Sequence, residues 1–142
     1  MPEQAIEYHK LLVGFEFPAQ SYRLDAALVA DYLMATGDDD ALYQTEPLVP
    51  PMAVTAFAMN SLSSAIVMPP GTIHVSQELD FLKTVQIGDT ITCYSTVSRK
   101  VDRGGLRLMN TDINVINQNQ EKVLSGRVGF VLPQPSVGAK NY

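Results

Sequence analysis

Three consecutive acids, Asp38, Asp39 and Asp40, follow Gly37 in the stretch GDDDALY and are the first residues here whose types suggest chemistry. Carboxylates are good ligands for calcium, but calcium loops alternate their ligands and close on a glutamate. Consecutive acids splay apart, and this stretch has no closing glutamate at the needed spacing. We therefore expect no metal site. A solvated turn and a water-orienting role for Asp38 both stay open.

His74 is one of only two histidines in the chain, and it lies on the polar side of an alternating strand pattern. An imidazole titrates near neutral pH and is suited to ligand contact or proton transfer, although a local hydrogen bond is the simpler role. Cys93 stands in the alternating run ITCYSTV, which favours a small strand residue over a nucleophile.

Basic residues gather around one predicted hairpin. Four of the ten, Arg99, Lys100, Arg103 and Arg107, fall within nine positions. Guanidinium groups bind phosphates through paired hydrogen bonds, so Arg99 and Arg103 are candidates for binding an anionic ligand. A solvated hairpin is the simpler explanation.

Two helices are predicted, and the three acids follow directly after the end of the first. Asp25 is a good N-cap, apolar residues at 28, 29, 32 and 33 have helical spacing, and Gly37 is suited to end the helix. The second covers residues 52–68, which carry no charge and lie between proline pairs. This segment is too short and too polar to span a membrane, so we expect a helix buried on nearly every side.

Strand patterns make up most of the remainder. Residues 11–23 read as an opening extended segment, and strands are predicted near 72–81, 90–101, 106–116 and 124–132. A long uncharged helix wrapped by an antiparallel sheet from the same chain is an α+β arrangement, the hotdog fold.

Length and charge limit the class of protein. The 142 residues predict one domain, residues 1–142, with about 133–142 as a loose tail. A net charge of −5 argues against general binding to nucleic acid or an anionic membrane. A single cysteine and no signal-peptide pattern favour a cytoplasmic protein.

The order of the segments resembles the MaoC-like hydratases and dehydratases, in particular the N-terminal half-domain of fatty-acid-synthase-like dehydratases. The matching pieces are ATGDDDALY with VPPMAV, and IHVSQELDFLKTVQIGDTIT. The likeness runs from about Val13 to Leu132. It implies an (R)-specific enoyl hydratase or 3-hydroxyacyl dehydratase acting on a thioester of coenzyme A or an acyl carrier protein, without a cofactor.

In catalytic members of that family an Asp and a His five positions later activate water, and backbone N–H groups at the start of the buried helix polarise the thioester carbonyl. Here Asp38 stands at the Asp position, but Tyr43 replaces the His. A phenol is a poor base at neutral pH. The resemblance assigns the N–H groups to Met52, Ala53 and Val54, and the ligand phosphates or an acidic carrier protein to the basic hairpin.

The half-domain resemblance implies that a partner half or subunit carries the intact Asp and His. A hotdog monomer exposes one edge of its sheet, so we expect a homodimer, or a heterodimer with a catalytic hotdog subunit. Two alternatives stay open. The same fold hosts acyl-CoA thioesterases, which usually place a carboxylate on the buried helix, whereas residues 52–68 have none. The chain could also be a non-catalytic acyl-binding or structural subunit.

Overall fold

The computed structural model describes residues 5–134, so most of the predicted tail lies outside the described residues. Its helices and strands are β1 (Ile6–Glu7), a 3-10 turn η1 (Tyr8–Lys10), β2 (Gln20–Arg23), α1 (Ala26–Thr36), α2 (Leu42–Thr45), α3 (Pro51–Ala65), β3 (Ile66–Val67), β4 (Ile73–Phe81), β5 (Thr90–Arg103), β6 (Leu106–Ile116) and β7 (Lys122–Val131).

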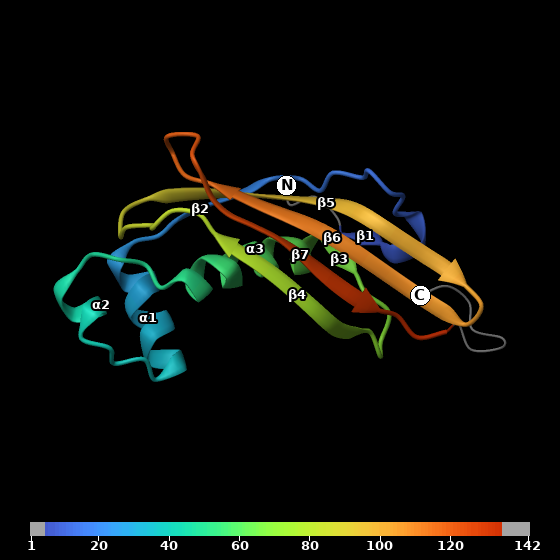
Figure 1. The fold of residues 1–142 in the computed structure, drawn as a ribbon, viewed down its shortest axis with the longest axis horizontal. Helices are drawn as coiled ribbons and strands as arrows, with labels where there is room; N and C mark the ends of the chain where they lie inside the picture. The colour runs from blue at the N-terminus through green and yellow to red at the C-terminus, as the bar shows by residue number, and fades with distance from the viewer. Residues whose placement is uncertain (1–4, 135–142) are drawn as a thin grey trace.

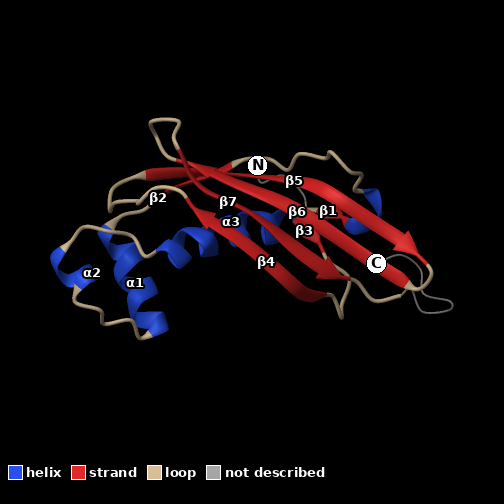
Figure 2. Ribbon diagram, viewed as in Figure 1, coloured by secondary structure: helices blue, strands red, loops and turns tan. Residues whose placement is uncertain are grey.

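Five strands form one antiparallel sheet in the order β2-β5-β6-β7-β4. The strands run across α3, which packs on the sheet's inner face (Figures 1 and 2). Alternate residues of β5 and β6 are buried, as expected for strands with one face against a core. The predicted antiparallel sheet around a central helix is therefore confirmed.

The central helix α3 begins at Pro51, where a missing N–H costs no intrahelical hydrogen bond. Its inner face buries small and branched residues: Ala53, Val54, Thr55, Ala58, Ser61 and Leu62. The opposite face, with Met52, Ala56, Asn60, Ser63 and Ser64, is exposed although it carries no charge. In the single chain the helix is thus buried along one face, not on nearly every side as predicted.

The helix also ends earlier than predicted, at Ala65. Ile66 and Val67 form β3, which pairs in parallel with β1 from the N-terminal segment. The sequence pattern did not predict this pairing, because two-residue strands leave no periodic signal.

A small helical layer covers one end of the molecule, where α1 and α2 lie together beside the start of α3 (Figure 1). The Asp25 carboxylate accepts a hydrogen bond from the Leu28 N–H at 2.9 Å. Gly37 ends α1 in the left-handed conformation, with φ of 70°. Both predicted ends of this helix are confirmed.

The two edges of the sheet differ. Residues 14–17 continue alongside β5 beyond the short strand β2, through hydrogen bonds of Gly14, Phe15 and Phe17 with the β5 backbone. No described segment pairs with the outer edge of β4. Its nine residues are nearly all exposed, including Ile73, Val75 and Phe81.

Candidate functional site

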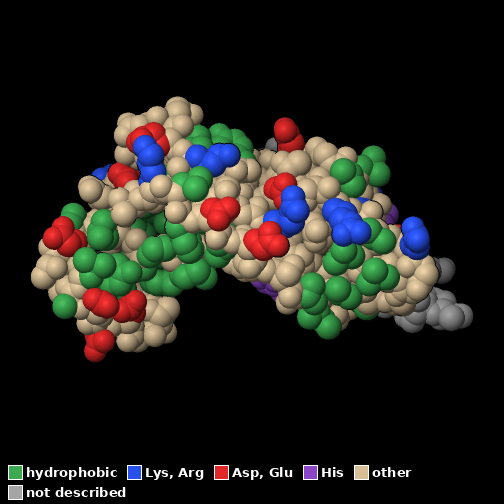
Figure 3. Space-filling view, viewed as in Figure 1, with side chains coloured by type: hydrophobic (Ala, Val, Ile, Leu, Met, Phe, Trp, Pro, Cys, Tyr) green, Lys and Arg blue, Asp and Glu red, His purple; other side chains and the backbone are tan. Residues whose placement is uncertain are grey.

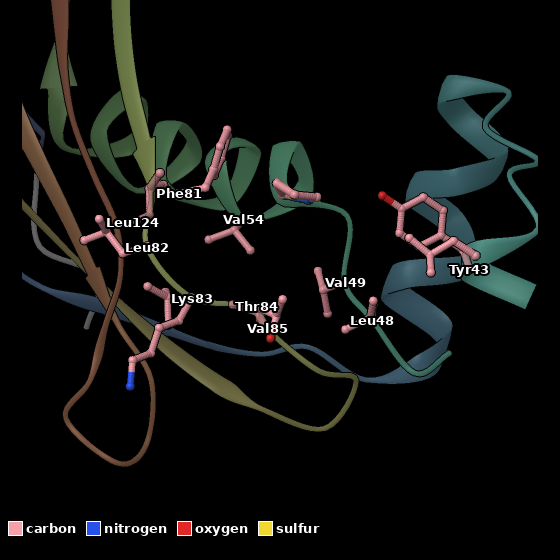
Figure 4. Close-up of a pocket in the computed structure, with 13 residues that line it drawn as sticks. Tyr43, Leu48, Val49, Val54, Phe81, Leu82, Lys83, Thr84, Val85 and Leu124 are labelled. Carbon is pink, nitrogen blue, oxygen red and sulfur yellow. The ribbon is translucent and has the colours of Figure 1, made fainter. Parts of the chain in front are cut away.

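A cavity of about 360 Å³ lies at the N-terminal end of α3 (Figure 4). Its lining is mostly apolar: Leu42, Tyr43, Leu48, Val49, Pro51, Val54, Phe81, Leu82, Lys83, Thr84, Val85, Val123 and Leu124. Hydrophobic side chains also gather between the helical end of the molecule and the sheet in Figure 3. A concave apolar surface with few polar groups is typical of a small-molecule site.

Backbone hydrogen bonds hold two walls of this cavity together. The Val49 N–H donates to the Val85 carbonyl oxygen and the Ile87 N–H to that of Pro47, each at 2.8 Å. The segment before α3 is thereby fixed to the connection between β4 and β5. This ladder positions the first turn of α3 against the end of β4.

Tyr43 supplies a polar group at the helical end of the cavity. Its side chain is partly buried, and its phenolic oxygen points towards the first turn of α3 (Figure 4). Burial raises the pKa of the Tyr43 phenol, and the charges of Asp38 and Asp40 raise it further. The phenol is therefore neutral at physiological pH, and it is a hydrogen-bond donor and no general base.

Asp38 forms part of the turn that precedes α2. Its carboxylate accepts a hydrogen bond from the Asp40 N–H at 3.1 Å, and the Asp40 carboxylate accepts one from the Leu42 N–H at 2.9 Å. Asp38 and Asp39 are exposed and are not among the cavity residues. The run of acids thus shapes a solvated turn that presents Tyr43.

The three predicted N–H donors differ in their surroundings. The Ala53 N–H donates to the Pro50 carbonyl oxygen at 2.9 Å, so this donor is occupied. Met52 is second in the helix, where a backbone N–H has no intrahelical acceptor. Val54 contributes a side chain to the cavity wall.

His74, Arg99 and Arg103 lie at the other end of the sheet. His74 pairs with Phe130, and their rings are 5.3 Å apart. His74 is seven residues from Phe81 along β4, which corresponds to about 20 Å of strand. Arg103 is the last residue of β5, at the hairpin. The structure does not bring these side chains to the cavity of their own chain.

Two residues of the basic group have a structural role that the sequence pattern did not reveal. Lys100 donates to the carbonyl oxygens of Tyr8 and Leu11, at 3.1 and 2.9 Å. Arg107 is buried and donates to the Pro133 carbonyl oxygen at 2.7 Å. Both cations lie over the Tyr8 ring in cation–π contacts. They fix the N-terminal segment to the β5–β6 hairpin.

Within residues 5–134, no group of three or more His, Cys, Asp or Glu side chains is arranged to hold a metal ion. In the same part of the chain, no helix has both the length and the apolar character needed to cross a membrane.

The comparison with known families decides the assignment. A family model described as "FAS1-like, dehydratase domain region" matches residues 11–125, most of the chain. The chain belongs to this family. The predicted likeness to MaoC-like hydratases and dehydratases is confirmed by this match together with the structural neighbours.

Three solved structures illustrate the fold. The R-hydratase PhaJ1 from Pseudomonas aeruginosa is 22% identical, with a TM-score of 0.75 over 92% of this chain and 88% of that one. The (R)-hydratase from A. caviae involved in PHA biosynthesis is 23% identical, with a TM-score of 0.72 over 87% and 98%. The ChsH1-ChsH2 complex from Mycobacterium tuberculosis contains a chain that is 15% identical, with a TM-score of 0.70 over 85% and 98%.

These likenesses establish the hotdog fold, as predicted. No curated protein sequence matches the chain significantly.

Sequence reasoning missed most of the cavity wall. Phe81, Leu82 and Val85 come from the end of β4 and the connection that follows, and Leu48 and Val49 from the segment before α3. The run of apolar residues at 81–82 in an otherwise alternating strand is the one signal that could have indicated a second apolar surface there.

Proposed function

We propose that this chain binds an acyl thioester, carried on coenzyme A or an acyl carrier protein, as one component of an (R)-specific enoyl hydratase or 3-hydroxyacyl dehydratase. One observation carries the proposal: an apolar cavity opens at the start of the central helix in a chain of the dehydratase-region family. Burial of an acyl chain against such a lining is favourable by about 25 cal/mol per Å².

The polar end of the ligand would lie near the first turn of α3. A helix N-terminus carries a partial positive charge and unpaired N–H groups, which favour a thioester carbonyl oxygen. Met52 offers such an N–H, whereas Ala53 is already bonded. The acyl chain then extends towards Phe81, Leu82 and Leu124.

The proton-transfer groups support a non-catalytic role for this subunit. Hydration of an enoyl thioester needs a base that titrates near neutral pH. The pKa of Tyr43 is raised, and Asp38 is exposed in a turn. We therefore place the Asp and His of the reaction on a partner hotdog subunit.

The outer edge of β4 is the proposed contact with that partner. The N–H and C=O groups that point outward from β4 have no strand partner among the described residues, and Ile73, Val75 and Phe81 expose apolar side chains, so this edge is a template for another strand. Antiparallel pairing of two such edges would bring the His74 end of one chain beside the Phe81 end of the other. Arg99 and Arg103 would then reach phosphates or an acidic carrier protein bound at a neighbouring cavity.

The single cysteine, Cys93, is consistent with the proposed cytoplasmic location, because extracellular domains of this size often rely on disulfides.

The test combines binding and turnover. We expect the pure chain to be stabilised against heat by an acyl-CoA, since a ligand that binds only the native state raises its stability, and to hydrate crotonyl-CoA slowly or not at all. Co-expression with a complementary hotdog subunit should yield a complex that is active. Robust turnover by the pure chain, abolished by Asp38→Ala, would contradict the partner assignment.

The same assay separates the thioesterase alternative. Release of free thiol from acyl-CoA substrates would indicate hydrolysis, which usually requires a carboxylate on the central helix. α3 has no acid along its length. Stabilisation by acyl-CoA without any product, alone or with a partner, would instead indicate a purely acyl-binding subunit.

A further inference from the structure

The cavity has very few side chains that can donate a hydrogen bond. Of its lining residues, Tyr43, Lys83 and Thr84 carry side-chain donors, and the remainder are apolar or proline. A ligand with a carbonyl group therefore has few places where that group can be bound.

Two of these donors are poorly placed. The Lys83 ammonium is paired with the Glu121 carboxylate and points away from the cavity (Figure 4). Thr84 lies in the exposed connection between β4 and β5. Among the described residues, neither offers a free donor directed at the inner space beside α3.

Tyr43 has a side-chain donor that is both free and directed towards α3. No hydrogen-bond partner of its hydroxyl is found within residues 5–134, and the hydroxyl points towards the first turn of α3 (Figure 4). A buried carbonyl oxygen without a donor costs about 1 to 3 kcal/mol, so the carbonyl of a bound ligand should lie where a donor is free.

From this placement we infer that the Tyr43 hydroxyl donates a hydrogen bond to the thioester carbonyl oxygen of the bound ligand and so distinguishes thioesters from other alkyl derivatives of the same carrier. The inference rests on the proposed acyl-thioester function and adds a positioning role to it. The residue that replaces the family's histidine thus recognises the ligand without taking part in proton transfer.

The protonation state of Tyr43 fits this role. Burial and the neighbouring carboxylates of Asp38 and Asp40 raise the phenol's pKa, so the hydroxyl keeps its proton well above neutral pH. An ionised phenol would accept hydrogen bonds and repel a carbonyl oxygen.

The experiment compares two ligands that differ in one oxygen atom. Hexanoyl-CoA has the thioester carbonyl, and its thioether analogue S-hexyl-CoA lacks it. We expect isothermal titration calorimetry to show that the wild-type chain prefers hexanoyl-CoA by about three- to tenfold, the value of one net hydrogen bond. Tyr43→Phe should reduce this preference while its affinity for S-hexyl-CoA stays unchanged, and the preference that is left reflects the Met52 N–H.

Tyr94→Phe is the matched control, because it makes the same change at an exposed tyrosine outside the cavity. Circular dichroism and the unfolding midpoint establish that each variant is folded. Equal losses for both ligands in Tyr43→Phe would show that Tyr43 acts by packing, and loss of the preference in Thr84→Val instead would assign the bond to Thr84. Either result overturns the inference.

The two proposals fail in different ways. If the wild-type chain binds neither ligand, the acyl-thioester function is wrong. If it binds both ligands equally well, the function stands and the role of Tyr43 is wrong.

Discussion

At the scale of single residues, the family resemblance places Tyr43 where catalytic members carry a histidine, and this difference changes what the proposed site can do. An imidazole gains and loses a proton near neutral pH, whereas the Tyr43 phenol, with its raised pKa, only donates a hydrogen bond. The neighbouring acids strengthen the difference, since a negative charge disfavours phenolate.

The raised pKa predicts how ligand binding depends on pH. A group with a raised folded-state pKa keeps its proton below that value, so the Tyr43 hydrogen bond is present at neutral pH and is lost only as pH rises past the phenol's ordinary value of about 10. We expect the hexanoyl-CoA preference over S-hexyl-CoA to be constant between about pH 6 and pH 9. Titrations at three pH values within this range measure it, and a preference that falls near pH 7 would indicate a titrating group other than Tyr43.

Some residue-scale features could be predicted and others could not. The turn formed by the acids was one of two roles that the local sequence left open, and the missing base at Tyr43 was indicated by the family resemblance. The burial of Arg107 and the clamp that Lys100 forms on the N-terminal segment depend on contacts between residues about 90 positions apart. Local patterns carry no information on such contacts.

At the scale of elements, β4 is held to the sheet through a close approach at two glycines of β7. A Cβ at Gly126 would lie 2.4 Å from the Glu78 carbonyl oxygen, which is backbone. A Cβ at Gly129 would meet the Ser76 hydroxyl at 2.3 Å, which is the end of a side chain. Backbone cannot rotate aside, so the two positions differ in what they tolerate.

Gly126→Ala should therefore destabilise the chain more than Gly129→Ala. We expect a loss of about 1 to 3 kcal/mol in the free energy of unfolding for Gly126→Ala, typical of overpacking, and a smaller loss for Gly129→Ala. Urea denaturation at equilibrium measures both. Because β4 ends in Phe81, a wall of the cavity, Gly126→Ala should also weaken acyl-CoA binding. Equal stabilities of the two variants would contradict this prediction and show that the β4 backbone can shift to make room for the added methyl group.

The elements themselves were largely predictable. Both ends of α1 follow from a capping acid and a glycine, and four strands follow from alternation. The extended segment predicted at 11–23 contains only the short strand β2, because residues before it run along β5 through single hydrogen bonds. α3 ends early because the residues that follow it, Ile66 and Val67, form β3 and pair with β1, which lies about 60 residues earlier in the sequence.

At the scale of the whole molecule, one side exposes both a sheet edge and a helix face that no described segment covers. The β4 edge exposes Ile73, Val75 and Phe81, and α3 exposes an uncharged face. The cavity is bordered by the end of β4 and the start of α3, so both surfaces reach it. A partner that covers the edge would therefore also help to enclose the ligand. In the proposed assembly, partner contact and ligand binding are therefore linked by geometry.

A single charge on this edge should separate assembly from folding. Val75 is half exposed on β4, outside the cavity lining, and a lysine there would have to be desolvated when another strand pairs with it. In sedimentation velocity, we expect Val75→Lys to reduce the mass of the proposed hotdog dimer to that of the single chain. The circular dichroism spectrum should be unchanged. Met34→Lys is the control, since Met34 is an exposed apolar residue on α1, away from the edge. The β4 edge is excluded as the contact if Val75→Lys assembles as the wild type does, or if Met34→Lys dissociates it equally.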